Sequence, residues 1–305
     1  MSAVHPIARR ALAPVSHRKL SPLYHVLVAE SETPDEREAR RDSVGRSAGE
    51  SYAATLEQMM PGVSIVRVAP ADEDAQVLGP EEIARYDAVF VTGSPLHVYD
   101  DTPEVRRQLA FMRAVFASGV PSFGSCAGLQ LAVAAAGGKV RKMPSRMEAG
   151  IARRITATAA GHDHPLLAGR AAAWAAPAIH GDEVEALPEG GTLLAGNAVT
   201  RIQAAEIRHD GGVFWGVQYH PELACGEIAA ALRRQVDSLI EAGLARDEAA
   251  VERRAALLDA LHDAPDDRAI LWELGVDREF ADQGRRRTEI ANFIDALVAP
   301  RRQAA

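Results

Sequence analysis

The sequence predicts an α/β fold: a doubly wound, mainly parallel sheet with helices on both faces, a mixed-sheet second half and a helical C-terminal extension. Two observations lead to this prediction. Apolar runs rich in β-branched residues alternate with helical patterns between Gly and Pro residues over the first half of the chain, an order typical of parallel sheets. One run, residues 87–92, is apolar almost throughout, as expected for a strand buried on both faces.

The composition is that of a globular protein with a full core. The 305 residues are 47% hydrophobic and 25% charged, which fits one large domain with an extension. The formal net charge of −8 disfavours a general nucleic-acid binder. The two cysteines favour a reducing, cytoplasmic compartment over a disulfide framework. Because no apolar run reaches the ~20 residues of a membrane helix, we expect a cytoplasmic protein without a membrane partner.

The N-terminal region predicts an arm and two strands. Residues 1–22 hold four Lys and Arg residues and no acid; without an apolar signal segment they predict a disordered arm, with a transit peptide as the alternative. Residues 23–29 predict the first strand. Residues 30–50 are dense in mixed charges and predict an exposed loop leading into a helix at 48–60. Residues 63–68 predict the second strand.

The middle of the chain continues the alternation. After the strand at 87–92, Thr102 is a suitable N-cap, with Pro103 at the first helical position. The helix that follows carries an apolar face at helical spacing, made of Val105, Leu109, Met112 and Phe116. A short apolar strand at 120–123 and a helix at 129–136 come next.

Residues 139–215 change character. They predict shorter strands at 151–158, 192–195, 204–208 and 213–217. His162-Asp163-His164 invites a metal interpretation, but the neighbouring Gly161 and Pro165 favour a surface turn. We therefore expect no metal.

From Glu227 the pattern is helical to the end of the chain. Two apolar faces have helical spacing: Ile228, Leu232, Val236 and Leu239, and later Ile290, Phe293, Ile294 and Leu297. Arg285-Arg286-Arg287 predicts a solvated face rather than an anion site. Cys225 could lie next to a site near His220, but we expect it to be a small apolar side chain buried in the core.

The heptad Gly124-Ser-Cys-Ala-Gly-Leu-Gln130 places Cys126 at a sharp strand-to-helix turn. This arrangement resembles a nucleophile elbow with Cys in place of Ser. Gly124 and Gly128 allow the close backbone approach that such a turn needs. The N-terminus of the following helix favours a thiolate, the attacking species. Taken alone, the heptad is equally consistent with an ordinary turn that holds a buried cysteine.

A second segment favours the catalytic interpretation. The run from Val213 to Tyr219 predicts a strand that stops at His220-Pro221-Glu222. His220 would lie at the carboxyl end of a strand, where α/β sheets gather their sites. Glu222 is close enough to orient the imidazole, as the third group of a triad does. A lone His at such a position would more simply be solvated beside a turn.

These segments together resemble the class I glutamine amidotransferase domain, of flavodoxin-like fold. Two further stretches agree with that family, the strand and turn 87–95 and the segment Ile179-His180-Gly181-Asp182-Glu183-Val184 with Leu187-Pro188-Glu189-Gly190. Within that family, the pattern most resembles a free-standing bacterial member similar to the glutaminase of GMP synthetase. The resemblance implies an amidotransferase-like domain at 23–243 and a helical extension at 244–305.

The resemblance also implies roles for residues. Cys126, His220 and Glu222 would form the catalytic triad. Backbone groups of Gly93, Ser94 and Ala127 would form the oxyanion hole, and Gln130 and Gln203 would line the glutamyl pocket. Ala127 stands where the family often carries an aromatic residue or Leu, but an oxyanion donor is backbone, so the chemistry would survive.

The implied chemistry is hydrolysis of a γ-glutamyl amide, glutamine or another γ-glutamyl compound, through a glutamyl thioester. The chain contains neither a Walker-type loop nor a dinucleotide fingerprint, and we expect no cofactor. Three hypotheses stay open. The chain could be a self-contained hydrolase, the glutaminase subunit of a synthetase partner, or a non-catalytic regulatory protein on the same fold. The triad disfavours the third, and the helical extension favours the first.

Overall fold

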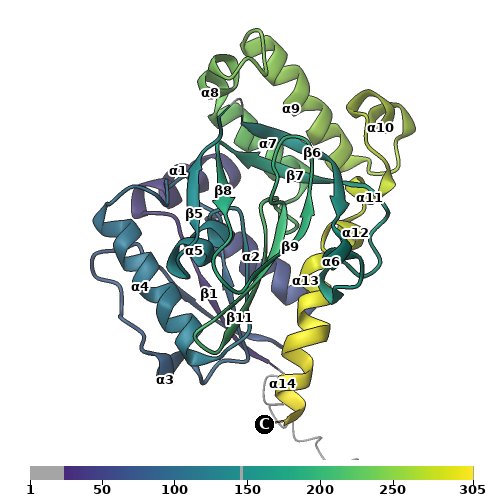
Figure 1. Ribbon diagram of the computed structural model, residues 1–305. Coiled ribbons are helices and arrows are strands. Elements are labelled where there is room, and N and C mark those ends of the chain that lie inside the picture. Colours follow the sequence, from purple (N-terminus) through teal and green to yellow (C-terminus); the bar gives the residue numbers. More distant parts are fainter. Residues whose placement is uncertain (1–23, 145–146, 305) are drawn as a thin grey trace, which may run out of the picture.

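The computed structural model describes residues 24–144 and 147–304 and places a large sheet at its centre (Figure 1). Its strand order is β2-β1-β3-β4-β11-β10-β9-β6-β7, and β5 pairs separately with β8. The strands are β1 His25–Ala29, β2 Ser64–Val68, β3 Ala88–Val91, β4 Ser122–Ser125, β5 Lys139–Lys142, β6 Glu148–Ala157, β7 Trp174–His180, β8 Asp182–Ala186, β9 Gly191–Gly196, β10 Ala204–His209 and β11 Gly212–Val217. The predicted arm, residues 1–22, lies outside the described residues.

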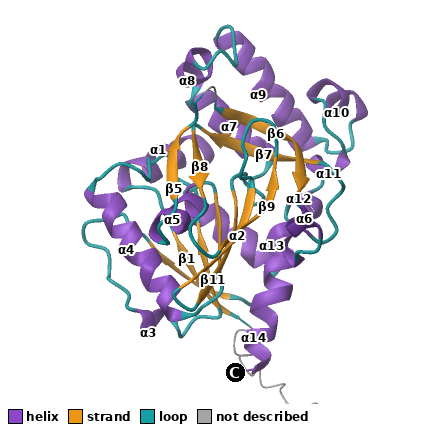
Figure 2. Ribbon diagram, in the orientation of Figure 1, coloured by secondary structure: helices purple, strands orange, loops and turns teal. Residues whose placement is uncertain are grey.

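Helices cover both faces of the sheet and one end of it (Figure 2). The α-helices are α1 Pro34–Val44, α2 Ala48–Met59, α3 Pro80–Ile83, α4 Pro103–Ser118, α5 Ala127–Ala135, α6 Ala159–His162, α7 Cys225–Arg234, α8 Val236–Glu241, α9 Glu248–Asp263, α10 Arg268–Leu274, α11 Arg278–Ala281, α12 Gln283–Arg286, α13 Thr288–Phe293 and α14 Ala299–Ala304. A 3-10 turn, η1 Pro165–Leu167, and a π-helical turn, η2 Ile294–Val298, complete the set.

The predicted doubly wound sheet with a mixed second half is confirmed. Strands β2, β1, β3, β4 and β11 are parallel, whereas β10, β9, β6 and β7 join by antiparallel pairs. Along β1, Val26 and Val28 face one core cluster and Leu27 faces another. This alternation follows from the two-residue period of a strand and leaves both faces apolar, which is why helices cover both.

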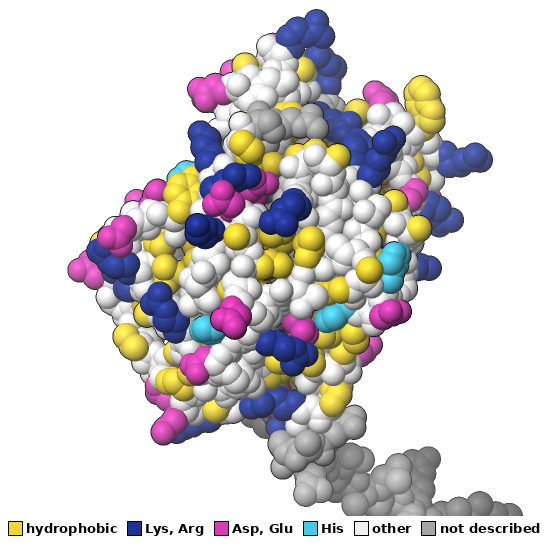
Figure 3. Space-filling model, in the orientation of Figure 1, with side chains coloured by type: hydrophobic (Ala, Val, Ile, Leu, Met, Phe, Trp, Pro, Cys, Tyr) yellow, Lys and Arg dark blue, Asp and Glu magenta, His cyan; other side chains and the backbone are white. Residues whose placement is uncertain are grey.

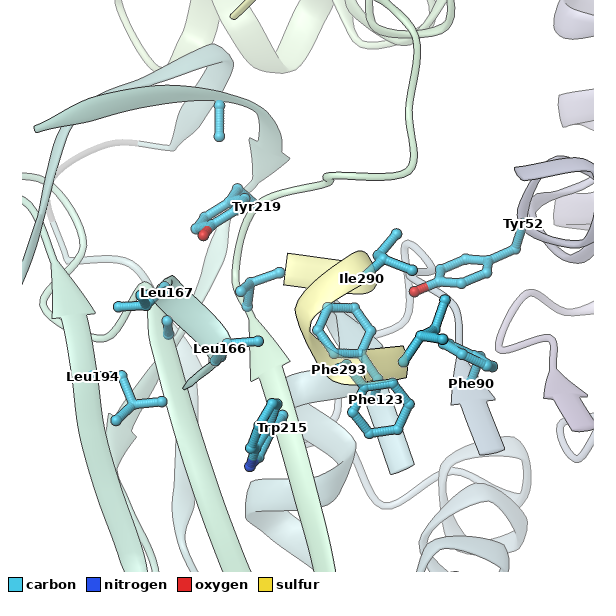
Figure 4. Packing of buried hydrophobic residues seen from close by; sticks show 14 of the residues in the cluster. Tyr52, Phe90, Phe123, Leu166, Leu167, Leu194, Trp215, Tyr219, Ile290 and Phe293 are labelled. Carbon is cyan, nitrogen blue, oxygen red and sulfur yellow. The ribbon is translucent and has the colours of Figure 1, made fainter. Parts of the chain in front are cut away.

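The C-terminal helices take part in the core. Ile290, Phe293 and Ile294 belong to the same buried cluster as β1, α2 and β4, and Figure 4 shows Phe293 beside Phe90 and Phe123. The predicted apolar face of the last helix is therefore the face that packs on the sheet. Earlier in the chain, α7, α9 and α10 build a third cluster against β6 and β7.

Residues 30–50 are not the exposed loop that the charges predict. Residues 34–44 form α1, whose N-cap Thr33 and N3 residue Glu36 make a reciprocal capping box. Arg40 is buried and pairs with Glu227 at 3.2 Å. The helix carries no apolar stripe, so caps and ion pairs stabilise it rather than a periodic hydrophobic face.

The arginine run also differs from the prediction. Arg285 is exposed, but Arg286 and Arg287 are buried. Arg286 donates from Nη1 to the backbone carbonyls of Phe280 and Ala281. A guanidinium can be buried when carbonyl oxygens satisfy its N–H groups, a contact that charge patterning alone does not reveal.

Lys and Arg side chains share the surface with Asp and Glu side chains on the face seen in Figure 3, as is typical of a solvated protein surface. None of the helices in residues 24–144 and 147–304 is long and apolar enough to cross a membrane.

Candidate active site

Cys126 lies at the turn between β4 and α5 with φ 53° and ψ −112°. This backbone conformation is uncommon for a residue with a Cβ and is typical of a strained elbow. The turn depends on its glycines: a Cβ at Gly128 would lie 2.5 Å from the carbonyl oxygen of Val91, and one at Gly124 would lie 2.9 Å from Phe214. The backbone N–H of Cys126 is held by the carbonyl of Val217 at 2.8 Å. The elbow is thus fixed against the end of β11, the strand that leads to His220.

His220 and Glu222 lie at that strand's end and form a close pair. Nδ1 of His220 donates to Oε1 of Glu222 at 2.7 Å. The hydroxyl of Ser125 donates to the other carboxylate oxygen at 2.8 Å, so both oxygens of Glu222 are fixed. The structure therefore brings together the three residues that the sequence singled out, and Ser125, which the sequence analysis did not assign, orients the carboxylate.

The electrostatics favour a protonated imidazole. Burial alone would lower the pKa of His220, but the negative charge of Glu222 and a hydrogen bond with Cys126 raise it to about 10. Cys126, His220 and Glu222 are each less than a tenth exposed, so solvent screens these interactions little. At neutral pH the imidazolium is the favoured partner for the sulfur.

Two of the predicted oxyanion residues, Gly93 and Ala127, lie next to Cys126. A Cβ at Gly93 would lie 2.8 Å from Cε1 of His220 and 3.4 Å from Cβ of Cys126, which puts the end of β3 in contact with both. Ala127 is the first residue of α5, where a helix leaves its N–H without an intrahelical acceptor. The hydroxyl of Ser94 accepts from the N–H of Leu96 at 3.3 Å and so shapes the turn.

Gln130 lies on α5 one turn after the elbow and is buried. Its Nε2 donates to the carbonyl of Asp182 and to Oε1 of Gln218, both at 3.2 Å. Its own Oε1 makes no hydrogen bond within residues 24–144 and 147–304. Gln130 therefore ties α5 to β8 and keeps one acceptor unused.

Gln203 is fully buried and donates from Nε2 to Oε2 of Glu148 at 2.6 Å. Glu148 also accepts from Nε2 of His180 at 3.2 Å and from Asn197 at 2.7 Å. Burial would raise the pKa of Glu148, but these hydrogen bonds hold it below its usual value. The network fixes the end of β7, whose Ile179 carbonyl lies 4.0 Å from the sulfur of Cys126.

Asp182, at the start of β8, is a site-lining residue to which the sequence analysis assigned no role. Its carboxylate binds Nδ1 of His97 at 2.6 Å and the hydroxyl of Tyr99 at 3.1 Å. Burial, and then the charge of Asp182, raise the pKa of Tyr99 to about 12. His97 and Tyr99 come from the loop that follows Gly93, and the only sequence signal for Asp182 was the His180-Gly181-Asp182 stretch.

His164, from the 162–164 segment considered for a metal, and Cys225 have partners of their own. His164 caps η1 and its Nε2 binds Glu206 at 3.3 Å, and the described residues contain no cluster of three or more His, Cys, Asp or Glu suited to a metal. Cys225 begins α7 and is buried in the cluster between α7 and α9.

Comparisons with known proteins identify the family of the chain. The family model "Glutamine amidotransferase class-I" matches residues 45–237. A γ-glutamyl-L-1-hydroxyisopropylamide hydrolase from a Pseudomonas species is 34% identical over 90% of this chain and 93% of its own. A GMP synthase from Porphyromonas gingivalis is 36% identical over 47% of this chain, but only 26% of the synthase is covered.

Solved structures share the fold. A glutamine amidotransferase from Thermotoga maritima superposes with a TM-score of 0.60 and 15% identity, covering 90% of this chain and 99% of that one. A glutamine amidotransferase from Methylobacillus flagellatus gives a TM-score of 0.54 at 19% identity, covering 91% and 96% of the two chains.

Proposed function

The chain belongs to the class I glutamine amidotransferase family, and on this premise we propose that it hydrolyses a γ-glutamyl amide as a self-contained enzyme. The observation that carries the proposal is the elbow cysteine held beside the His220–Glu222 pair. The similarity to a γ-glutamyl amide hydrolase along nearly the whole of both chains supports an amide of a small amine as the substrate class.

The first half of the reaction forms a thioester. The Cys126 thiolate attacks the side-chain carbonyl carbon of the glutamyl group, and the oxygen gains the negative charge. Backbone N–H groups at Ala127 and the Gly93-Ser94 turn stabilise that oxyanion, each worth about 3 kcal/mol in comparable sites. The C–N bond then breaks as the His220 imidazolium gives its proton to the leaving amine.

The second half hydrolyses the thioester. Neutral His220 takes a proton from water, and the hydroxide attacks the thioester carbon. The C–S bond breaks, glutamate leaves and the thiolate–imidazolium pair is restored. Glu222 keeps the Nδ1–H of His220 in place through both steps.

Gln130 and Gln203 stay candidates for the glutamyl pocket. The unused Oε1 of Gln130 is suited to accept a hydrogen bond from substrate. Gln203 is fully buried behind Glu148, so its contribution is to the shape of the pocket wall.

A glutaminase subunit that delivers ammonia to a separate synthetase is the second candidate function. The similarity to GMP synthase favours it, but the match spans about a quarter of that protein. A small-molecule γ-glutamyl compound is the substrate in both cases, and only the second requires a partner.

The test is trapping of the acyl-enzyme. Purified protein would be quenched in acid during turnover of a γ-glutamyl amide, and intact and peptide mass spectra would be recorded. A glutamyl adduct on the peptide that contains Cys126, absent from Cys126→Ala, is the expected result. Turnover without any adduct in a wild-type sample, and retained in Cys126→Ala, would remove Cys126 from the mechanism.

A further inference from the structure

The turn that carries His220 is held by a residue far along the chain. Tyr219, immediately before His220, donates its hydroxyl to Oε1 of Glu289 at 2.7 Å. Both side chains are completely buried. Glu289 belongs to α13 of the C-terminal extension, 70 residues from Tyr219, so this contact joins the extension to the candidate base.

Glu289 is itself held rigidly. Arg170, in the segment before β7, donates from Nε to Oε1 at 2.7 Å and from Nη2 to Oε2 at 2.6 Å. Its Nη1 donates to Glu279 at 2.8 Å. A two-pronged contact of this kind fixes direction as well as distance. The acceptor for the Tyr219 hydroxyl is therefore a fixed point rather than a mobile side chain.

The C-terminal extension also holds the turn at Glu222, through Thr55 and Arg287. The hydroxyl of Thr55 donates to the backbone carbonyl of Glu222 at 3.4 Å, and that hydroxyl accepts from Nη2 of Arg287 at 3.2 Å. Arg287 is buried and also donates to Gln58 at 2.8 Å. Between these two anchors, the N–H of His220 binds the carbonyl of Pro177 at 2.8 Å.

We propose that Glu289 is a positioning residue for His220, acting through the hydroxyl of Tyr219. The side chain of Tyr219 lies in the main core cluster (Figure 4), while His220 contacts Gly93 and pairs with Glu222. Tilting the Tyr219 ring therefore turns the adjoining peptide and moves the imidazole. The proposal rests on the proposed function, because it assigns His220 the role of base.

The experiment compares two variants with matched controls. Tyr219→Phe removes one hydroxyl and leaves the Arg170–Glu289 pair intact. Glu289→Gln removes the negative charge of the carboxylate that accepts the hydrogen bond from Tyr219. Tyr86→Phe is the first control, since Tyr86 stacks on His25 before β3 and away from the elbow. Glu279→Gln is the second, because it alters a contact of the same Arg170 without touching Tyr219.

Two readouts are needed. With a γ-glutamyl amide, the Tyr219 and Glu289 variants should lose kcat by about tenfold or more, with KM within about twofold, since a small misplacement of a catalytic group costs this much. The rate of Cys126 alkylation by iodoacetamide at neutral pH should fall in both variants, because a displaced imidazolium stabilises the thiolate less. Both control variants should retain wild-type values.

Wild-type kcat and an unchanged rate of Cys126 alkylation in folded Tyr219→Phe would overturn the proposal. Should Glu289→Gln fail to fold, Tyr219→Phe still decides, because every other contact of Glu289 is kept. If the wild-type protein hydrolyses no γ-glutamyl amide, the proposed function fails, and the rate of Cys126 alkylation alone tests whether Glu289 positions His220.

Discussion

Cys126 and Cys225 are both buried, but they have different neighbours. Cys126 lies at the N-terminus of α5 beside a protonated His220. Burial raises the pKa of Cys225, and the positive charge of Arg286 offsets only part of this increase. Iodoacetamide at neutral pH should therefore label Cys126 well before Cys225, as followed by peptide mass spectrometry. Faster labelling of Cys225 would contradict the assignment of Cys126 as the activated thiol.

The raised pKa of His220 sets the sign of the pH dependence. The folded-state value of about 10 lies above the ordinary value of about 6.5, so the folded state binds the proton more tightly. The stability contributed by this proton is complete below pH ~6.5 and is lost as the pH rises through about 10. Since the leaving amine needs the same proton, kcat/KM should fall on the alkaline side near that pH, and denaturant titrations should show stability falling over the same range. A fall in both quantities centred near pH 7 would contradict the ion-pair description.

His220 and Glu222 should contribute unequally. His220→Asn removes the acid and base and should lower kcat by about 10²–10⁴-fold. Glu222→Gln retains a side chain that Ser125 can still hold and should lose less, because an orienting group commonly matters less than the base. Steady-state kinetics of the two variants checks this order, and equal losses would show that Glu222 does more than orient the ring.

At the scale of elements, α13 and η2 are part of the sheet's packing. Phe293 is fully buried between Phe90, Phe123 and Trp215. Phe293→Ala should lower the free energy of unfolding by about 3–5 kcal/mol, as truncation of a core aromatic does. The matched control is Trp272→Ala in the same extension, since Trp272 is 85% exposed and should change stability by less than about 0.5 kcal/mol. Chemical denaturation measures both, and similar small losses would show that the extension is peripheral.

The elements that the sequence predicted are those with a periodic apolar face or a continuous apolar run. The helix from Pro103 was predicted with its N-cap Thr102, because cap and hydrophobic spacing agree. Helix α1 was missed because its mean pattern is polar, although Thr33, Glu36 and Gly45 mark its ends. Strands β7 and β8 were missed because Ala and charged residues replace the β-branched run there, and antiparallel pairing with β6 and β5 stabilises them instead.

At the scale of the molecule, the parts of the site that the sequence revealed are those within single short motifs. Cys126 stands out through its glycines, and His220 and Glu222 through the strand they end. The partners of these residues could not be predicted the same way. Tyr219 and Glu289 meet across 70 residues, and nothing in either local pattern specifies the other. Tertiary packing alone brings them together, which is why the extension's link to the site emerges only from the fold.

The last prediction separates a self-contained enzyme from a subunit. Oxyanion donors must be in place before charge develops, and the chain's own residues hold the Gly93-Ser94 turn that we propose for this role. The N–H of Ser31 donates to the hydroxyl of Thr92 at 3.0 Å, and that hydroxyl donates to the carbonyl of Gly93 at 3.1 Å.

We expect the purified chain, without ATP or any partner, to hydrolyse a γ-glutamyl amide at a steady rate in a coupled assay for released glutamate. Because α13 and η2 already cover one face of the sheet, no second protein is needed to complete that face. Cys126→Ala, prepared in parallel, controls for contaminating hydrolases. A folded chain that is silent on glutamine and on a panel of γ-glutamyl amides, and that becomes active only when a synthetase is added, would show instead that the turn requires a partner to reach its working geometry.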